Sequence, residues 1–163
     1  MSADLSELQN WLAPLLHALA PAQRRQLAAQ VARAVRQQTQ RTMRAQTSPE
    51  GQPWEKRRAE LLAASGPRAA LRQRAARGPM MRRLALARNL KMQATPDEAV
   101  VAFVGRVQRI AAVHQWGLSD RVSSRNRVMH TYAARPMLGI SPEMTDIIRA
   151  AVLDHLQTAL QKE

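Results

Sequence analysis

The chain has 163 residues, no cysteine and a formal net charge of +13, with 25 Lys and Arg against 12 Asp and Glu. This length is enough for one domain, because a compact chain of this size buries about 70% of its unfolded surface. The absence of cysteine excludes disulfides, thiolate zinc sites and cysteine nucleophiles, and with them a small secreted disulfide scaffold. We expect a single domain over residues 1–163, with N-terminal helices at 1–46, a basic turn and arm at 47–92, and a small sheet plus a C-terminal helix at 93–163.

The positive charge is concentrated in the middle of the chain. Residues 24–91 contain 17 basic and three acidic residues, a net charge of +14, whereas residues 1–23 carry −2 and residues 92–163 carry +1. Such a surface attracts polyanions and supports sequence-independent binding of nucleic acid. The alternative is a solvated basic face, or a face matched to an acidic partner. The candidate contacts for DNA or an acidic partner are Arg33, Arg36, Arg44, Arg57, Arg58, Arg82 and Arg83.

Aromatic residues are scarce, with three Trp, one Tyr and one Phe. This composition favours helices over an all-β sandwich, and it leaves few side chains to stack on single-stranded bases. No helix-turn-helix, zinc-finger or basic-zipper pattern is evident. The uncharged stretch between Asn10 and Arg24 is interrupted by prolines and is too short to span a bilayer, and acidic rather than basic residues precede it. We therefore expect a soluble protein without a targeting segment.

The first elements along the chain are predicted to be helical. Leucines recur every three or four residues over 5–19, which is typical of a short amphipathic helix kinked at Pro14. Pro21 opens a long helix that runs to about Ala45, with an apolar stripe opposite a row of arginines. Gln38 and Thr42 continue the stripe as polar residues. We therefore expect the far end of this helix to project from the body or to meet another subunit.

A turn and a basic segment follow. Residues 47–54 contain two prolines and a glycine, which predicts a turn. Residues 55–92 are rich in Ala and Arg and are broken by Gly-Pro at 66–67 and 78–79. They are compatible with short helices, an ordered arm, or a segment that folds only on assembly. The apolar side chains just after Pro79 indicate that this part packs.

Two strands and a short helix are predicted next. A turn at residues 95–98 precedes a β-branched run that ends at a glycine, which predicts a strand at 100–104. Residues 106–115 form a short helix that a glycine ends. A polar loop follows at 118–126, and residues 128–132 form a second strand. We expect these two strands to make one small antiparallel sheet.

The clearest helix begins at Ser141, with Pro142 at its first position and acidic residues near the positive end of its dipole. Large apolar residues recur every four positions from Met144 to Leu160, so this helix should anchor the core by packing on the sheet. His155 lies within that face and is expected to be a packed side chain rather than a ligand. The predicted fold is α+β and mainly helical, with a long N-terminal helix, a small antiparallel sheet and a packed C-terminal helix.

The sequence contains no catalytic constellation. The four histidines lack metal-binding spacing, and neither a phosphate-binding glycine loop nor a Gly-x-Ser-x-Gly motif is present. The sequence therefore predicts a protein that is not an enzyme, with no cofactor, no metal and no small-molecule substrate.

Three segments carry a family resemblance. They are Ser48–Trp54 (SPEGQPW), Ile110–Gly117 (IAAVHQWG) and Tyr132–Ser141 (YAARPMLGIS). In this order they resemble the Pro-Asp-Gly-x-x-Trp turn, the Ile-Ala-x-Val-His-Gln-x-Gly stretch and the Tyr-Pro-Ala-Arg-Pro-Leu-Leu-Gly-Leu-Ser segment of the phage virion morphogenesis family, the tail completion proteins of Mu-like and related contractile-tailed phages. The sequence departs from that pattern at Glu50, where the family usually has Asp, and at Ala133, where it usually has Pro.

The resemblance implies structural work in the virion. Members of the family are needed to finish the tail so that it can join the DNA-filled head, as a ring at the head-proximal end. The implied partners are other copies of the chain in a hexameric ring, neighbouring tail and neck proteins, and double-stranded DNA in the lumen, with no membrane. The implied location is the tail or neck of the virion, after assembly in the host cytoplasm. The alternative function is a basic, sequence-independent DNA-binding protein.

Three residues in these segments are candidates for a subunit interface. Trp54 is either an interface anchor or a cover over its own core. Arg135 either binds a carboxylate across a subunit boundary or satisfies loop carbonyls in its own chain, and we favour the second. Tyr132 is expected to close the edge of the core with its hydroxyl in water. His114 and Trp116 are expected to pack the junction of the short helix and the sheet.

Overall fold

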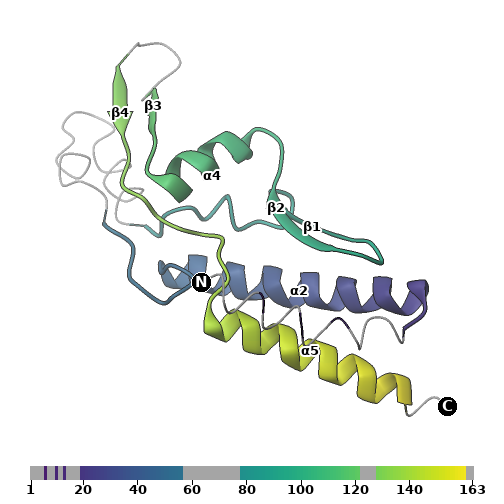
Figure 1. Ribbon diagram of the computed structural model, residues 1–163. Helices are drawn as coiled ribbons and strands as arrows, with labels where there is room; N and C mark the ends of the chain where they lie inside the picture. The colour runs from purple at the N-terminus through teal and green to yellow at the C-terminus, as the bar shows by residue number, and fades with distance from the viewer. Residues whose placement is uncertain are drawn as a thin grey trace.

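The computed structural model describes residues 19–56, 78–121 and 128–160, together with the single positions Ser6, Asn10 and Ala13. The elements with full bounds are α2 (Pro21–Ala45), β1 (Leu90–Ala94), β2 (Ala99–Phe103), α4 (Val107–Trp116), β3 (Ser119–Arg121), β4 (Met129–Thr131) and α5 (Pro142–Leu160). The β1–β2 hairpin lies along one side of α2 and α5 lies along another, while α4 and the β3–β4 hairpin extend away from this body (Figure 1). The prediction of a mainly helical α+β fold is confirmed.

The helix α2 has the bounds that the sequence predicts. Pro21 occupies its first turn, and the side chain of Gln23 accepts a hydrogen bond from the Ala20 N–H at 3.0 Å. The helix ends at Gln46, which adopts the left-handed conformation. The expectation that its far end projects from the body is wrong, because Gln38, Thr39 and Met43 there are all buried.

The far end of α2 is covered by the segment that follows Pro79. The side-chain amide of Gln46 donates to the Met80 carbonyl at 3.0 Å and accepts from the Met80 N–H at 2.6 Å. Six residues earlier in the chain, Gln40 donates to the Ala85 carbonyl at 2.7 Å. Met80 and Leu84 are buried, so the prediction that this part packs is confirmed.

The strands form two separate hairpins instead of one sheet. β1 pairs antiparallel with β2, and the Thr95 N–H donates to the Glu98 carbonyl at 2.9 Å in the predicted turn between them. β3 pairs antiparallel with β4. The predicted pairing of 100–104 with 128–132 is therefore wrong, and so is the loop predicted over 118–126 where β3 lies. Each strand pairs with its neighbour in sequence, because closing a short turn costs less chain entropy than closing a longer loop.

The C-terminal helix packs on α2. Ser141 caps α5, since its hydroxyl accepts from the Met144 N–H at 3.2 Å, and this confirms the predicted start. Met144 and Ile148 form a cluster with Val31 and Val35 of α2, so the expectation that this helix packs on the sheet is wrong. The helix that packs on the first hairpin is mainly α2, with a smaller contact between α4 and β2.

His155 is packed, as predicted. It is buried, and its Nδ1 lies 3.0 Å from the Oε1 of Gln30 on α2. A larger core joins the end of α2 to the first hairpin and α4; it comprises Met43, Trp54, Met80, Leu84, Ala85, Leu90, Phe103, Ala111 and Met137.

Some predictions fall outside the described residues. They are the helix at 5–19 except for Ser6, Asn10, Ala13 and Leu19, the segment 57–77 with Arg57 and Arg58, and residues 122–126 of the predicted loop. No helix of the described ranges is long and apolar enough to cross a bilayer.

Candidate functional site

The three segments that carry the family resemblance meet at one place, which we call the motif junction (residues 48–54, 110–117 and 132–141). The indole N–H of Trp54 donates to the Pro136 carbonyl at 3.0 Å. The Arg135 N–H donates to the His114 carbonyl at 2.6 Å. At Gly139 an added Cβ would lie 3.0 Å from Pro49, so the turn after α2 packs tightly on the third segment. The motif junction therefore joins stretches that are about 80 residues apart in sequence.

Gln115 is the residue of this junction that sequence reasoning missed. Its Oε1 accepts from the N–H groups of Met137 at 2.8 Å and Leu138 at 3.0 Å, and its Nε2 donates to the Leu138 carbonyl at 2.8 Å. One side chain thus supplies the hydrogen-bond partners that a neighbouring strand would otherwise give to the backbone of Met137 and Leu138. The usable signal in the sequence is a glutamine in the otherwise apolar end of the helix predicted at 106–115.

Trp54 and Arg135 make their contacts within their own chain. Trp54 is only 7% exposed and belongs to the larger core, so it covers that core. Arg135 is also 7% exposed; its Nε donates to the Glu55 carbonyl at 2.9 Å and its Nη1 to the Ala133 carbonyl at 3.4 Å. Arg135 therefore satisfies loop carbonyls, the alternative we favoured. Roles of these two residues at a subunit boundary stay predictions.

Tyr132 is the centre of a ring cluster. It is half-buried and contacts His114 edge-on at 5.0 Å between ring centroids, and His130 edge-on at 4.8 Å. Gly117 ends α4 with a φ of +67°, and an added Cβ there would lie 3.0 Å from the Ala134 nitrogen. Only glycine combines that backbone conformation with so close an approach. The cluster and the glycine together fix the chain that leaves β4 against the end of α4.

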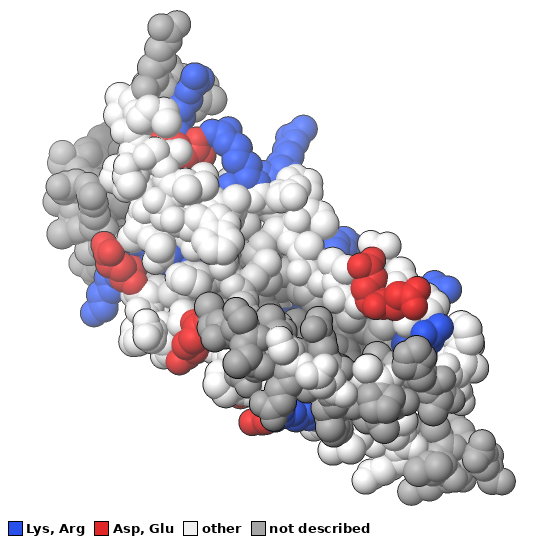
Figure 2. Space-filling view, viewed as in Figure 1, with Lys and Arg blue, Asp and Glu red and all other residues white. Residues whose placement is uncertain are grey.

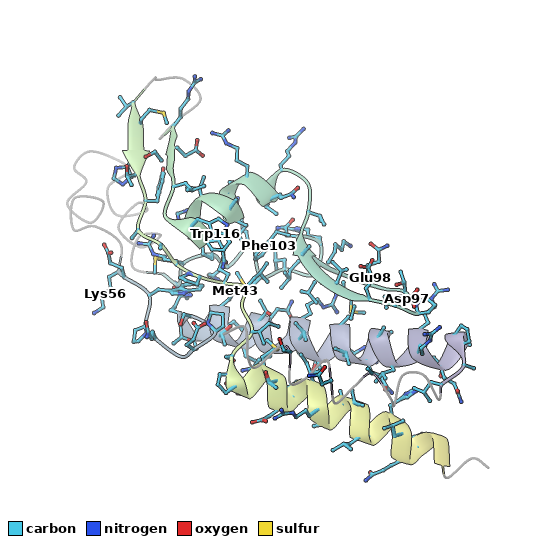
Figure 3. All side chains as sticks on the ribbon, viewed as in Figure 1. Met43, Lys56, Asp97, Glu98, Phe103 and Trp116 are labelled. Atoms are coloured by element: carbon cyan, nitrogen blue, oxygen red, sulfur yellow. The ribbon has the colours of Figure 1, made fainter. Side chains whose placement is uncertain are left out.

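Trp116 lies outside this packing. It is 70% exposed, so the prediction that it packs the junction of the helix and the sheet is wrong. It borders an apolar groove of about 410 Å³, the α4 groove, which lies between α4, β2 and the third motif segment. Figure 3 shows Trp116 and Phe103 on neighbouring elements at this place. The groove is lined by Ala102, Phe103, Gln108, Ala111, Ala112, Gln115, Trp116, Leu138 and Gly139.

A second exposed surface is formed by the arginines of α2. Arg33, Arg41 and Arg44 are exposed on one face of the second half of the helix. Arg82, from the turn that covers the helix end, is exposed and lines a cavity of about 350 Å³ together with Arg44. We call these four residues the arginine face. Of the other predicted contacts, Arg83 is exposed nearby in sequence and Arg36 is half-buried.

The comparison with known proteins decides the family. The model of the phage virion morphogenesis family matches residues 3–157 of the chain. The chain belongs to this family. The curated protein named "Tail completion protein S" of Escherichia phage P2 is 31% identical over 155 residues, which cover 94% of this chain and 98% of that protein. No solved structure matches the chain significantly.

In this member of the virion morphogenesis family, the resemblance recognised from the three segments is confirmed, and those segments build the interior motif junction. No group of three or more metal-ligating side chains occurs in the described part of the chain. Two surfaces of the described residues that are open to a partner are the α4 groove and the arginine face. The three family segments thus hold the fold, and some of their residues, Trp116 among them, also line the exposed α4 groove.

Acidification is expected to destabilise this family member through His114. Burial, and secondarily the positive charge of Arg135, lower the pKa of His114 below the ordinary value of 6.5. Because the unfolded chain then binds the proton more tightly, the stabilisation is complete above the unfolded pKa and is lost as the pH falls below it. We expect the urea midpoint to drop between about pH 7.5 and about pH 5.5.

The variant His114→Phe should reduce this drop, because it keeps an aromatic ring beside Tyr132 and removes the proton site. The matched control is His130→Phe, which changes the other ring of the cluster and should keep the pH dependence. Equal pH dependence in the wild type and in His114→Phe would show that other groups cause the effect.

Proposed function

We propose that this protein completes the phage tail as a structural subunit of the virion. In this proposal it forms a ring, of six copies by family resemblance, at the head-proximal end of the tail and lets the tail join the head. It acts by contact with neighbouring tail and neck proteins, without a cofactor or a chemical step. The observation that carries the proposal is the match, over nearly the whole of both chains, to a protein named for tail completion.

The exposed surfaces support a role in assembly. A closed ring of identical copies needs two different patches on each copy that fit each other. The α4 groove suits one such patch, because exposed tryptophan beside an apolar hollow is typical of the residues that dominate interface energies. We propose that a neighbouring copy in the ring occupies it. Tyr132, which is partly exposed at the edge of the motif junction, is a second interface proposal.

The basic surface is the other part of the proposal. In a ring the positive segments repeat around the axis and their potentials add. They can then face either double-stranded DNA in the lumen or an acidic rim of a neighbouring protein. Both partners are compatible with a place at the end of the tail.

The variant Trp116→Ala should fold normally but fail to complete tails. Little buried surface is lost within the chain, because the side chain is 70% exposed. Loss of an interface hot spot costs about 2 kcal/mol or more, which is roughly 30-fold in affinity at each subunit boundary. The measurement is the titre of infectious particles when the variant complements a phage that lacks the gene, with tails examined by electron microscopy.

The control for that experiment is Leu153→Ala. Leu153 is an apolar side chain on α5 that is 48% exposed and lies away from the α4 groove. It should complement like the wild type. A normal titre with Trp116→Ala would exclude the groove as an interface, and a normal titre from phage without the gene would overturn the proposed function itself.

A further inference from the structure

The arginine face is a row of guanidinium groups on a rigid element. Arg33, Arg41 and Arg44 are eight and three residues apart, so they follow one face of α2 over about 16 Å. Gln37, at the position between the first two, is also exposed and adds amide donors. Arg82 extends the row across the cavity beyond the helix end. The spacing is fixed by the helix and by the hydrogen bonds that attach the covering turn.

The charges of this face are not neutralised within the described part of the chain. The ion pairs there join Arg24 to Asp97 at 3.8 Å, Arg109 to Asp120, and Arg149 to Asp146 at 3.7 Å. None of them involves the arginine face. Asp97 and Glu98 lie at the tip of the β1–β2 hairpin, at the end of α2 opposite to Met43 (Figure 3). The second half of α2 therefore presents positive charge to which no carboxylate of the described residues is bound.

The surroundings of the face fit phosphates better than a protein surface. Stable protein interfaces have an apolar, often aromatic centre, and the exposed residues of α2 include no large apolar side chain. The exposed apolar residue at its margin is Leu86, in the cavity with Arg44 and Arg82. Among the described residues, no aromatic side chain lies on the face for bases to stack on, as single strands require. Of the partners considered, the face therefore best fits one that carries regularly repeated negative charge and needs no apolar contact.

We infer that the arginine face binds the phosphate backbone of double-stranded DNA without reading its sequence. Duplex DNA carries one charge per about 1.7 Å of its axis, so the row spans several phosphates. An α-helix with its side chains already nearly fills the major groove, which is about 12 Å wide. Because α5 and the β1–β2 hairpin pack alongside α2, the helix and its neighbours together are too wide to enter that groove (Figure 1). The contact is therefore to the backbone alone.

This inference deepens the proposed function by naming the partner of the basic surface, and its experiment needs no virion. The full chain is titrated with two 30-bp duplexes of unrelated sequence, with a single-stranded thymidine oligonucleotide and with poly-glutamate, over a range of salt concentrations from about 50 mM. The test variant is Arg33→Gln/Arg41→Gln/Arg44→Gln, since glutamine matches arginine in helix propensity. The control is Lys91→Gln/Arg106→Gln/Arg121→Gln, which removes the same charge from exposed positions on other elements. Figure 2 shows that basic side chains also lie over α4 and the β3–β4 hairpin.

We expect both duplexes to bind equally and the log-log salt slope to become shallower by about 2.7 in the test variant, about 0.9 for each lost contact. Affinity near 50 mM salt should fall on the order of 100-fold or more, and Arg82→Gln alone should reduce the slope by about 0.9. The control should keep most of the wild-type slope. An equal loss in the control, stronger binding to the single strand, or binding to poly-glutamate but not to duplex would each overturn the inference while leaving the complementation result for the proposed function untouched.

Discussion

Replacing Trp54 with alanine will lower the free energy of unfolding by about 3–5 kcal/mol, the range observed when a large aromatic side chain is removed from a core. Trp54 is 7% exposed and contacts the same core as Met43, Leu90 and Met137. The substitution leaves a cavity there, and it also leaves the Pro136 carbonyl without its donor. The total free energy of unfolding of a native protein is about 5–15 kcal/mol, so the variant will be close to unfolding.

The measurement is urea denaturation followed by far-ultraviolet circular dichroism, with Trp54→Phe and Trp116→Ala beside it. Trp54→Phe keeps most of the apolar volume and loses the indole donor, so about 1 kcal/mol is expected from the missing hydrogen bond and a somewhat larger loss from the smaller ring. Trp116→Ala should change stability by less than about 1 kcal/mol, as surface substitutions do. Similar losses for the two alanine variants would contradict the opposite burial of the two tryptophans.

The helices could be predicted from the sequence because their signals are local. Pro21 and Ser141 mark starts that depend on a few neighbouring residues, and the apolar periodicity behind them needs no knowledge of the partner. Strand pairing is different, because it depends on which segment lies alongside. β1 has the sequence Leu-Lys-Met-Gln-Ala after an arginine-rich stretch, which gives little β-branched signal, so its pairing with β2 was missed.

Burial of polar residues was the second property that the pattern did not predict. Gln38 continues the apolar stripe of α2 as a polar residue, yet it is buried, and so is its neighbour Thr39. The turn after Pro79 covers the end of the same helix. The hydrogen bonds that hold this turn come from glutamine side chains, Gln40 and Gln46, whose roles depend on a segment more than 30 residues away. A charged or polar helix end is therefore not sufficient evidence for a free end.

The candidate site also has a part that the sequence predicted and a part that only the structure shows. The residues that resemble the family motifs build the motif junction, so the resemblance carries the fold and the general place of the protein in phage assembly. Trp116 stands at the second of two unspecified positions of the Ile-Ala-x-Val-His-Gln-x-Gly stretch, so the pattern gives no indication that it lines an open groove. The arginine face lies wholly outside the three segments. The surfaces that could select partners therefore had to come from the structure.

Replacing Gln115 with leucine will lower the free energy of unfolding by about 3 kcal/mol, although leucine is a better helix former and fits the apolar groove. The three backbone groups that Gln115 satisfies, two on Leu138 and one on Met137, lose their partner together. Each lost hydrogen bond costs about 0.5–1.5 kcal/mol, with more where the freed group stays away from water. The variant Gln115→Glu keeps an acceptor for the two N–H groups but sets a carboxylate against the Leu138 carbonyl, so an intermediate loss is expected.

The specific readout is hydrogen exchange at the Met137 and Leu138 amides. In the wild type their N–H groups are protected by the Gln115 side chain. In Gln115→Leu they should exchange faster, because the free energy of local opening falls by the contribution of that hydrogen bond. Gln108→Leu is the matched control, because Gln108 lies on the same face of α4 and lines the same groove but is exposed and should change stability by less than about 0.5 kcal/mol. Unchanged protection of these two amides in Gln115→Leu would mean that the third segment is held by Trp54 and Arg135 alone. The Gln115 side chain would then not stabilise the motif junction.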